Sequence, residues 1–330
     1  MKKFYLGIEI GASKHQIALG DAGGNIIHTR QGKVALAEGA VGILKWMQEN
    51  IPPLIGMAEA SGGRVEAAGV GFGGIIDSAE GISLVSVQVD GWKEFNLKRW
   101  FECAFGIPTT VLNDTVAGGW GEYICGSGQG SRSFFYTNIG SGIGGVFIFD
   151  GKCYDGIGYG AAYFGHTYIP DWTSHEPGAF CKVESICSGF GIEKRLRSEG
   201  YVPLDSMIMG LCDYKRESIQ CLMLEQAARA GDVFALAEIA RIARSYAIGL
   251  SNVITLISPD RISIGGGVAK MGKLLLAPVR EYADELAFIS SKGRYEIVTC
   301  THEDAAVVVG AVLTAAQDFD KSGPLLDNVG

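Results

Sequence analysis

The chain has 330 residues, enough for two α/β domains, because single hydrophobic cores stop growing at about 250–300 residues. Its formal net charge is −8 and it contains no run of Lys or Arg. This charge distribution argues against binding to nucleic acid or to an anionic membrane. We therefore expect a small molecule as the partner, with no nucleic acid and no membrane.

The eight cysteines contain no CxxC pair, and the first residues, MKKFYLGIEI, lack the pattern of a signal peptide. No apolar run approaches the roughly 20 residues that cross a bilayer. We therefore expect a cytoplasmic protein whose thiols are reduced and mostly buried.

The first predicted element is a glycine-tipped hairpin. Residues 4–10 are typical of a strand, Gly11-Ala-Ser-Lys14 predicts a turn, and residues 15–20 return as a second strand. The same pattern recurs with a strand over 134–139, a turn beginning at Gly140 and a return strand over 146–149. This weak internal repeat predicts two similar half-molecules, each of which opens with a glycine-tipped hairpin.

The other predicted elements alternate between helix and strand. Apolar spacing predicts helices over 37–49, 191–198, 218–230, 233–257 and 304–319, and strands over 65–76, 109–112, 261–264 and 295–300. Asn113-Asp114 and Gly265–Gly267 should each follow the end of a strand. We expect the boundary between the two halves near residue 117.

Glycine-tipped turns expose backbone N–H groups without side chains, which suits the close approach of a polyphosphate. Ordinary hairpin turns also require Gly. A simple turn, with no role in phosphate binding, therefore explains either glycine-tipped hairpin when it is considered alone. Lys14 suits a position near phosphates, although a single Lys after a turn is more often solvated.

Asn113-Asp114 after a short strand suits the activation of a hydroxyl group. The Asp114 carboxylate would accept the proton of the attacking hydroxyl while the Asn113 amide holds the substrate. The alternative is structural, because both residue types also favour Asx-turns and helix N-caps.

Several motifs, in this order along the chain, resemble the ROK family of sugar kinases and sugar-responsive repressors, within the actin-like ATPase superfamily. They are the hairpin at Glu9–Lys14, Gly69-Val-Gly-Phe-Gly-Gly74 ending at Asp77, Gly91-Trp92, Asn113-Asp114, Thr137-Asn-Ile-Gly-Ser-Gly-Ile-Gly-Gly145, Gly165-His166, Glu184 with Ser188-Gly189, and Gly265-Gly-Gly267. The resemblance spans nearly the whole chain.

This resemblance implies an α/β fold of the two-lobed actin-like ATPase (ribonuclease H-like) type, with a duplicated α/β core and a central cleft. The smaller lobe would comprise residues 1–117, with the C-terminal helix at about 304–320 packing back onto it. The larger lobe, 118–303, would carry the nucleotide site and an oligomer interface. Family members often form homodimers or homotetramers, so we expect one of these.

The resemblance also implies an ATP-dependent kinase that transfers the γ-phosphate to a hydroxyl of a small sugar or sugar-like polyol, with Asp114 as the general base. Mg²⁺ would arrive with ATP, and Glu9 would hold it through water. The implied substrate-binding residues are Gly74, Asn113, Asp114, Tyr163, His166 and Glu184. The implied ATP-binding residues are Gly11, Ala12, Ser13, Lys14, Gly140, Ser141, Gly142, Gly265, Gly266 and Gly267.

The sequence departs from the family pattern around the sugar and the first hairpin. Glu9 and Ala12 stand where the family usually has Asp and Gly. Tyr163 replaces a sugar-binding Glu, and Gly73 replaces a Pro beside the sugar. The loss of a carboxylate and the gain of an aromatic face argue against assuming glucose as the substrate.

Many family members also carry a zinc motif, whose three cysteines would fall on His175, Pro177 and Lys182. Pro and Lys do not ligate zinc, so we expect no structural zinc. The alternative is a non-standard site built from His166, His175 and Cys181, with Cys187 as a further candidate ligand.

Two other functions need to be considered. One is suggested by these departures, and the other is the repressor role known in the family. The altered residues are consistent with a sugar-sensing protein or degenerate kinase that binds a sugar without turnover. A repressor would need a helix-turn-helix ahead of the first hairpin, and only three residues precede Phe4, so we do not expect that role. The sequence leaves the substrate open among glucose, N-acetylmannosamine, allose, fructose and a cyclitol.

Overall fold

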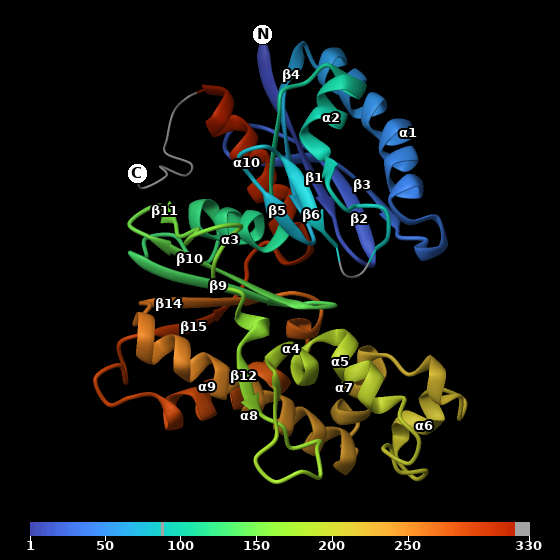
Figure 1. The fold of residues 1–330 in the computed structure, drawn as a ribbon, viewed down its shortest axis with the longest axis vertical. Coiled ribbons are helices and arrows are strands. Elements are labelled where there is room, and N and C mark those ends of the chain that lie inside the picture. The colour runs from blue at the N-terminus through green and yellow to red at the C-terminus, as the bar shows by residue number, and fades with distance from the viewer. Residues whose placement is uncertain (87–88, 321–330) are drawn as a thin grey trace. The chain divides into compact units, whose positions relative to one another are not determined.

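The computed structural model describes residues 1–86 and 89–320, and the chain divides into two compact units (Figure 1). The first unit contains residues 1–136, 145–162 and those from 300 onward, and the second contains 137–144 and 163–299. These units do not coincide with the predicted lobes, whose boundary near 117 falls inside a helix. That boundary stays a prediction, because the extent of two compact units does not locate a hinge.

The sheet of the first unit has the strand order β3-β2-β1-β4-β8. Its strands are β1 (Lys2–Ile10), β2 (Lys14–Gly20), β3 (Ile26–Lys33), β4 (Gly63–Phe72) and β8 (Thr109–Asn113). β1 pairs antiparallel with β2 and parallel with β4, and β4 pairs parallel with β8. The predicted hairpin is therefore confirmed. β3 was missed because this mostly exposed edge strand lacks a clear apolar alternation.

The two faces of this sheet are covered by different helices (Figure 1). Helix α1 (Gly39–Ala60) contributes Ile43 and Met47 to a core that includes Leu6 and Ile8 of β1. Residues that alternate with these on the sheet face α10 (Ala306–Asp320), where Tyr5 and Ala67 share a core with Val312. The alternation is the period-2 pattern of a strand buried on both faces.

Two paired glycines allow α10 to lie unusually close to the sheet. Gly7 of β1 is the register partner of Gly69 of β4. A Cβ atom at Gly7 would lie 2.2 Å from the Val308 carbonyl oxygen, and one at Gly69 would lie 2.0 Å from the Ala311 carbonyl oxygen. No other residue type fits there without displacing the helix.

The remaining elements of the first unit are short. The helices are η1 (Leu36–Glu38), α2 (Leu97–Phe105), α3 (Asp114–Cys125) and η5 (Glu303–Ala305), and a small sheet is formed by β5 (Ile75–Asp77), β6 (Ile82–Val85) and β7 (Phe95–Asn96). The structure thus divides the strand predicted over 65–76 into β4 and β5, because the chain turns at Gly73-Gly74.

A second sheet has the strand order β11-β10-β9-β14-β15. Its strands are β9 (Ser133–Ile139), β10 (Ile143–Phe149), β11 (Lys152–Cys153), β14 (Arg261–Gly265) and β15 (Glu296–Thr299). β9 and β10 are the predicted second hairpin. Their place in the order matches that of β1 and β2 in the first sheet, which is the duplication that the internal repeat predicts.

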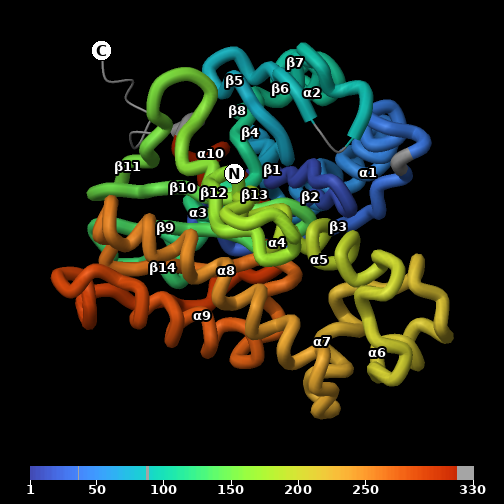
Figure 2. The backbone as a smooth tube through the Cα atoms, turned by 60° about the horizontal axis from the view of Figure 1, so that its bottom comes forward, coloured from blue at the N-terminus to red at the C-terminus, as the bar shows by residue number. Residues whose placement is uncertain are grey.

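The second unit is rich in helices. These are η2 (Phe164–His166), α4 (Val183–Cys187), α5 (Gly189–Leu196), α6 (Met207–Leu211), η3 (Arg216–Ser218), α7 (Cys221–Arg229), α8 (Val233–Ile257), η4 (Val268–Met271) and α9 (Lys273–Leu286), and a short hairpin joins β12 (Tyr168–Pro170) to β13 (Phe180–Lys182). α8 and α9 pack side by side (Figures 1 and 2).

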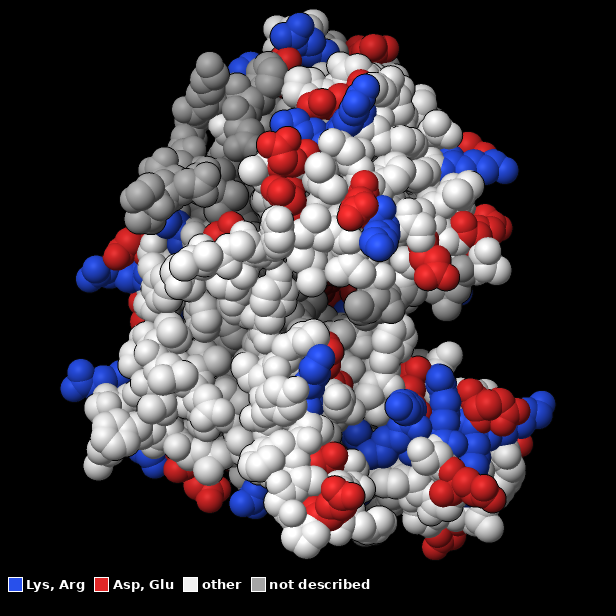
Figure 3. All heavy atoms as spheres, in the orientation of Figure 1, with Lys and Arg blue, Asp and Glu red and all other residues white. Residues whose placement is uncertain are grey.

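The surface carries both signs of charge. Figure 3 shows Lys and Arg side chains over α5 to α7 with Asp and Glu beside them. Arg197 pairs with Glu193 at 2.8 Å and Arg229 with Glu225 at 2.7 Å. Within the described parts of the chain, no helix is both long and apolar enough to span a membrane.

Because α10 lies so close to the sheet, adding a single methyl group at a glycine beneath it should lower the stability of the first unit. Replacing Gly69 with Ala should destabilise the first unit by about 1–3 kcal/mol, because the helix must move off the sheet. Gly56→Ala is the matched control, since Gly56 lies inside α1 with nothing within 4 Å of its Cβ position, and should be neutral or stabilising. Chemical denaturation measures both, and equal effects of the two substitutions would contradict the packing described.

Candidate active site

The parallel strands of the first unit end together at one edge of the sheet. Ile10 at the end of β1 pairs with Phe72 at the end of β4, and Phe72 pairs with Asn113 at the end of β8. The loops that follow carry most of the residues of the first unit that the sequence singled out. Carboxyl ends of parallel strands are the usual ligand-binding edge of α/β sheets.

Asn113 caps helix α3. Its Oδ1 accepts from the backbone N–H groups of Thr115 at 2.9 Å and Val116 at 3.3 Å, and its Nδ2 donates to the Gly74 carbonyl at 3.1 Å. The structural alternative, a helix N-cap, is therefore correct for this side chain. Its amide keeps a second N–H that these contacts do not use.

Asp114 is the first residue of α3 and lies beside the loop after β4. Its Oδ1 accepts from the Thr115 backbone N–H at 2.7 Å. Its Oδ2 faces Gly73, whose Cβ position would be 3.3 Å away, and Gly73 in turn lies against the Gly11 turn. Burial raises the pKa of Asp114 to about 6, although the Thr115 hydrogen bonds lower it. A carboxyl group with such a pKa suits a general base near neutral pH.

Glu9 lies almost wholly buried at the end of β1. Lys14 Nζ is 3.5 Å from its Oε2, and Gln16 Nε2 donates to the same oxygen. Lys14 and Gln16 also donate to the Asp304 carbonyl, at 3.2 and 2.6 Å. Burial raises the pKa of Glu9 to about 7, opposed by the Lys14 charge and the Gln16 hydrogen bond. The Glu9 carboxyl, the Lys14 amine and the Gln16 amide thus form one polar cluster at the base of the first hairpin.

Sequence reasoning missed Gln16 and Asp304. Gln16 was within reach, because counting pairs outward from the turn places it opposite Glu9 in the hairpin register. The Asp304 carbonyl had no signal, because it is a backbone atom 288 residues away from Gln16.

The first hairpin turn is held by its backbone. Gly11 N–H donates to the Lys14 carbonyl at 3.1 Å, Val34 N–H to the Ser13 carbonyl at 3.1 Å, and Gly73 N–H to the Ile10 carbonyl at 2.8 Å. The Ser13 side chain is exposed and Ala12 is partly exposed. This turn is a compact backbone loop at the sheet edge, beside Asp114.

In the second unit, two predicted glycine clusters meet the start of α5. Gly140 N–H donates to the Gly142 carbonyl at 3.0 Å, and the Gly140 carbonyl accepts from Gly189 at 2.7 Å. Gly266 has φ +90° and packs so tightly on Ile139 that a Cβ atom would lie 2.6 Å from its carbonyl. The Gly140–Gly142 and Gly265–Gly267 turns thus flank the end of β9, where they offer backbone N–H groups without side chains.

The predicted sugar-binding residues of the second unit also lie together. His166 Nε2 is 3.3 Å from Glu184 Oε1, and the rings of Tyr163 and His166 meet edge to face with centroids 6.4 Å apart. Lys182 joins them, with Nζ 3.0 Å from His166 Nδ1. The sequence had indicated Lys182 only as a lost zinc ligand. Its contact with His166 depends on the pairing of β12 with β13, two strands that the sequence did not predict.

The donor set for zinc does not fit. Over the described ranges, no three His, Cys, Asp or Glu side chains are grouped so as to hold a metal ion. Burial raises the pKa of Cys181 to about 11, which opposes the thiolate that zinc requires. His166 Nδ1 faces the Lys182 amine, which places a cationic group beside one of the two ring nitrogens that could ligate a metal. Pro177 and Lys182 at two of the motif positions supply no ligand.

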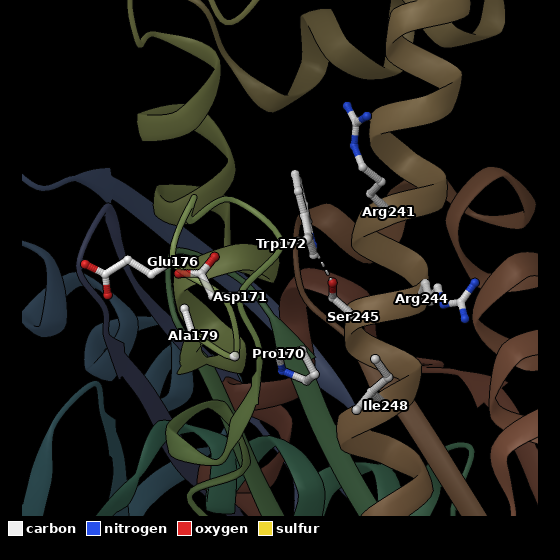
Figure 4. A pocket seen from close by; sticks show the side chains of 10 residues that line it. Pro170, Asp171, Trp172, Glu176, Ala179, Arg241, Arg244, Ser245 and Ile248 are labelled. Atoms are coloured by element: carbon white, nitrogen blue, oxygen red, sulfur yellow. Dashed lines mark hydrogen bonds between the residues drawn. The ribbon is translucent and has the colours of Figure 1, made fainter.

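Trp172 anchors the loop that follows β12. Its indole N–H donates to Ser245 Oγ of α8 at 2.8 Å, as Figure 4 shows. The guanidinium carbons of Arg195 and Arg241 lie 5.1 and 5.2 Å from the ring centroid. Both arginines pair with Glu238, at 2.7 and 2.6 Å, and Glu238 is fully buried. The loop is thereby tied to α5 and α8, beside a cavity of about 390 Å³.

Removing this anchor should loosen the loop without unfolding the unit. In Trp172→Ala, two cation–π contacts of about 0.5–1 kcal/mol each and one hydrogen bond are lost, so amide exchange over 171–182 should accelerate about tenfold or more. Trp172→Phe should be intermediate. Phe180→Ala on the same hairpin is the control, because Phe180 is exposed. Exchange that stays unchanged in Trp172→Ala would show that the loop is held by something else.

Comparison with known proteins places this geometry in a family. The sequence pattern of the ROK family matches residues 5–318. A glucokinase of Halalkalibacterium halodurans is 27% identical over 96% of each chain, and a xylose repressor of Caldicellulosiruptor bescii is 23% identical over 95% of this chain and 78% of the repressor.

A solved structure agrees with the fold. The ROK family glucokinase of Streptomyces griseus, in complex with glucose and AMPPNP, superimposes with a TM-score of 0.82 and 27% identity, over 95% of this chain and 99% of that one. Two predictions are therefore confirmed: the family, and the α/β fold of the sugar kinases in that family. The chain belongs to the ROK family.

Proposed function

We propose that this protein is an ATP-dependent kinase that phosphorylates a hydroxyl of a small sugar or sugar-like polyol, with Asp114 as the general base. The observation that carries the proposal is the position of Asp114: a partly buried carboxyl whose Oδ2 faces Gly73, which in turn lies against the Gly11 turn. That the chain is a sugar kinase is supported by the glucokinase relatives, which match it over nearly its whole length.

The role of Asp114 follows from its two oxygens. Oδ1 accepts from the Thr115 N–H, which holds the carboxyl group at the start of α3. Oδ2 faces Gly73 in the loop after β4, and we assign the proton to this oxygen. A base with a pKa of about 6 is ionised at neutral pH and is still basic enough to accept a proton from the attacking hydroxyl.

Phosphate binding is assigned to the glycine turns. Each unit carries glycine turns, Gly11–Ser13 in the first and Gly140–Gly142 with Gly265–Gly267 in the second. Little side-chain bulk covers their backbone, which suits phosphate oxygens and the rest of ATP, although the N–H groups of Gly11 and Gly140 are bonded within their own turns. Lys14 is held by Glu9 and the Asp304 carbonyl, so its charge is fixed at the base of the first turn. Mg²⁺ bound to ATP would supply charge neutralisation, and the carboxyl groups of Glu9 and Asp114 fit a hydrated cation.

Each unit offers hydrogen-bonding groups that suit a sugar. Asn113 retains one amide N–H for a sugar hydroxyl after capping α3 and bonding Gly74. His166 and Glu184 offer a donor and an acceptor, and Tyr163 offers an exposed aromatic face. Homodimer or homotetramer formation stays a prediction from the resemblance, and a cytoplasmic location stays a prediction from the sequence.

The base assignment predicts a specific loss and a specific pH profile. Asp114→Asn should lower kcat/KM by about 100-fold or more, because a positioned base contributes about 10²–10⁴-fold. In the unaltered protein, kcat/KM should fall about tenfold per pH unit between about pH 7 and 6, where Glu9 loses its charge, and about 100-fold per pH unit below about pH 6, where Asp114 loses its charge as well. Coupled-enzyme assays of ADP release measure both.

Two further variants sharpen this test. Glu9→Gln should leave a single acidic limb near pH 6 if Asp114 sets it. Asp150→Asn is the matched control, because Asp150 is exposed in a surface ion pair with Arg132 and should change nothing. Sugar binding that persists while the unaltered protein turns over no sugar would favour the sugar-sensing alternative. An Asp114→Asn rate within tenfold of the unaltered rate would refute the base assignment.

A further inference from the structure

The Lys182, His166 and Glu184 side chains form a series of close polar contacts in the second unit. Lys182 Nζ lies 3.0 Å from His166 Nδ1, and His166 Nε2 lies 3.3 Å from Glu184 Oε1. A lysine ammonium group donates hydrogen bonds and accepts none. In a neutral ring beside it, Nδ1 must be the acceptor, and Nε2, the nitrogen on the Glu184 side of the ring, therefore carries the hydrogen.

The backbone around these residues fixes the series. Lys182 ends β13, where it pairs with Tyr168 of β12, two residues after His166. Val183 N–H donates to the Thr167 carbonyl at 2.9 Å, which ties the start of α4 to the residue after His166. Glu184 lies in the first turn of α4. The short hairpin thus brings a lysine and a glutamate to opposite nitrogens of one imidazole.

We infer that Lys182 is a positioning residue: it selects the tautomer of His166 and so places the ring hydrogen on Nε2, the nitrogen beside Glu184. In its assignment of the sugar to His166, this inference rests on the proposed function. Which nitrogen carries the proton is set by the partner of the other nitrogen, and here that partner is Lys182. The series then presents one donor, Nε2–H, beside one acceptor, the Glu184 carboxylate, a pattern that matches a sugar hydroxyl.

The contact has a second consequence. A hydrogen bond to Nδ1 and a metal bond to Nδ1 use the same lone pair, so the Lys182 contact and a cation at this nitrogen exclude each other. Lys182 therefore gives His166 an orienting partner that does not depend on a metal ion. Because the pair is exposed, its contribution to global stability should be small, and its effect should appear in the ring itself.

The direct test is the tautomer of His166 by ¹⁵N NMR, at a pH where the same spectra show a neutral ring. In the unaltered protein, Nδ1 should show the shift of an acceptor nitrogen and Nε2 that of a protonated one. Lys182→Met should give averaged shifts from a mixture of tautomers, and Lys182→Arg, which retains a donor, should restore the single form. Unchanged ring shifts in Lys182→Met would overturn the inference.

Kinetics test the consequence for the sugar. Lys182→Met should raise the KM for the sugar about five- to tenfold, the loss expected for about one hydrogen bond, while kcat and the KM for ATP change little. Lys182→Arg should recover most of the loss. Lys194→Met is the control, because Lys194 is an exposed lysine of α5 in the same unit and should change neither readout.

The two readouts separate this inference from the proposed function. An unaltered protein that phosphorylates no sugar would refute the kinase proposal, and the NMR result would then decide the role of Lys182 alone. A tautomer that changes while the KM for the sugar stays constant would refute the positioning role and leave the kinase proposal intact.

Discussion

The burial of two carboxyl groups, Glu9 and Asp114, where the parallel strands of a mixed sheet end is the constraint on which the rest of the first unit depends. Burial opposes their ionisation and raises both pKa values into the neutral range. Such groups persist only where the surroundings fix them, and here the surroundings are strand ends, a helix N-terminus and a glycine turn. The sheet supplies these by register, since β1, β4 and β8 end together.

The helix on the far face of this sheet contributes to the same edge. α10 lies close to β1 and β4 because Gly7 and Gly69 have no side chains. The segment that leads into α10 carries Asp304, whose carbonyl accepts from Lys14 and Gln16 beneath the hairpin. Packing and electrostatics are therefore linked: a helix displaced from the sheet would also withdraw the acceptor that orients Lys14.

Sequence alone predicted much of this fold because its signals are local. Alternating strands, glycine turns and the Asn113-Asp114 strand end are all readable within a few residues, and the internal repeat showed that the hairpin occurs twice. β3, β6 and β7 were missed because they are short or mostly exposed, and β5 was predicted only as the end of β4. The Asp304 carbonyl was beyond reach, because a backbone acceptor leaves no trace in residue identity. From the sequence, Lys182 was considered only as a residue that cannot ligate zinc. Its contact with His166 could not be predicted, because it depends on the pairing of β12 with β13.

Direct detection of the product tests the central claim most sharply. The protein should be incubated with ATP, Mg²⁺ and a panel of hexoses, N-acylhexosamines and cyclitols, and followed by ³¹P NMR for a phosphomonoester coupled to sugar protons. The account predicts such a signal for at least one compound, formed in equal amount to ADP and lost in Asp114→Asn. ADP and free phosphate without any sugar phosphate, or no consumption of ATP while a sugar binds, would contradict it.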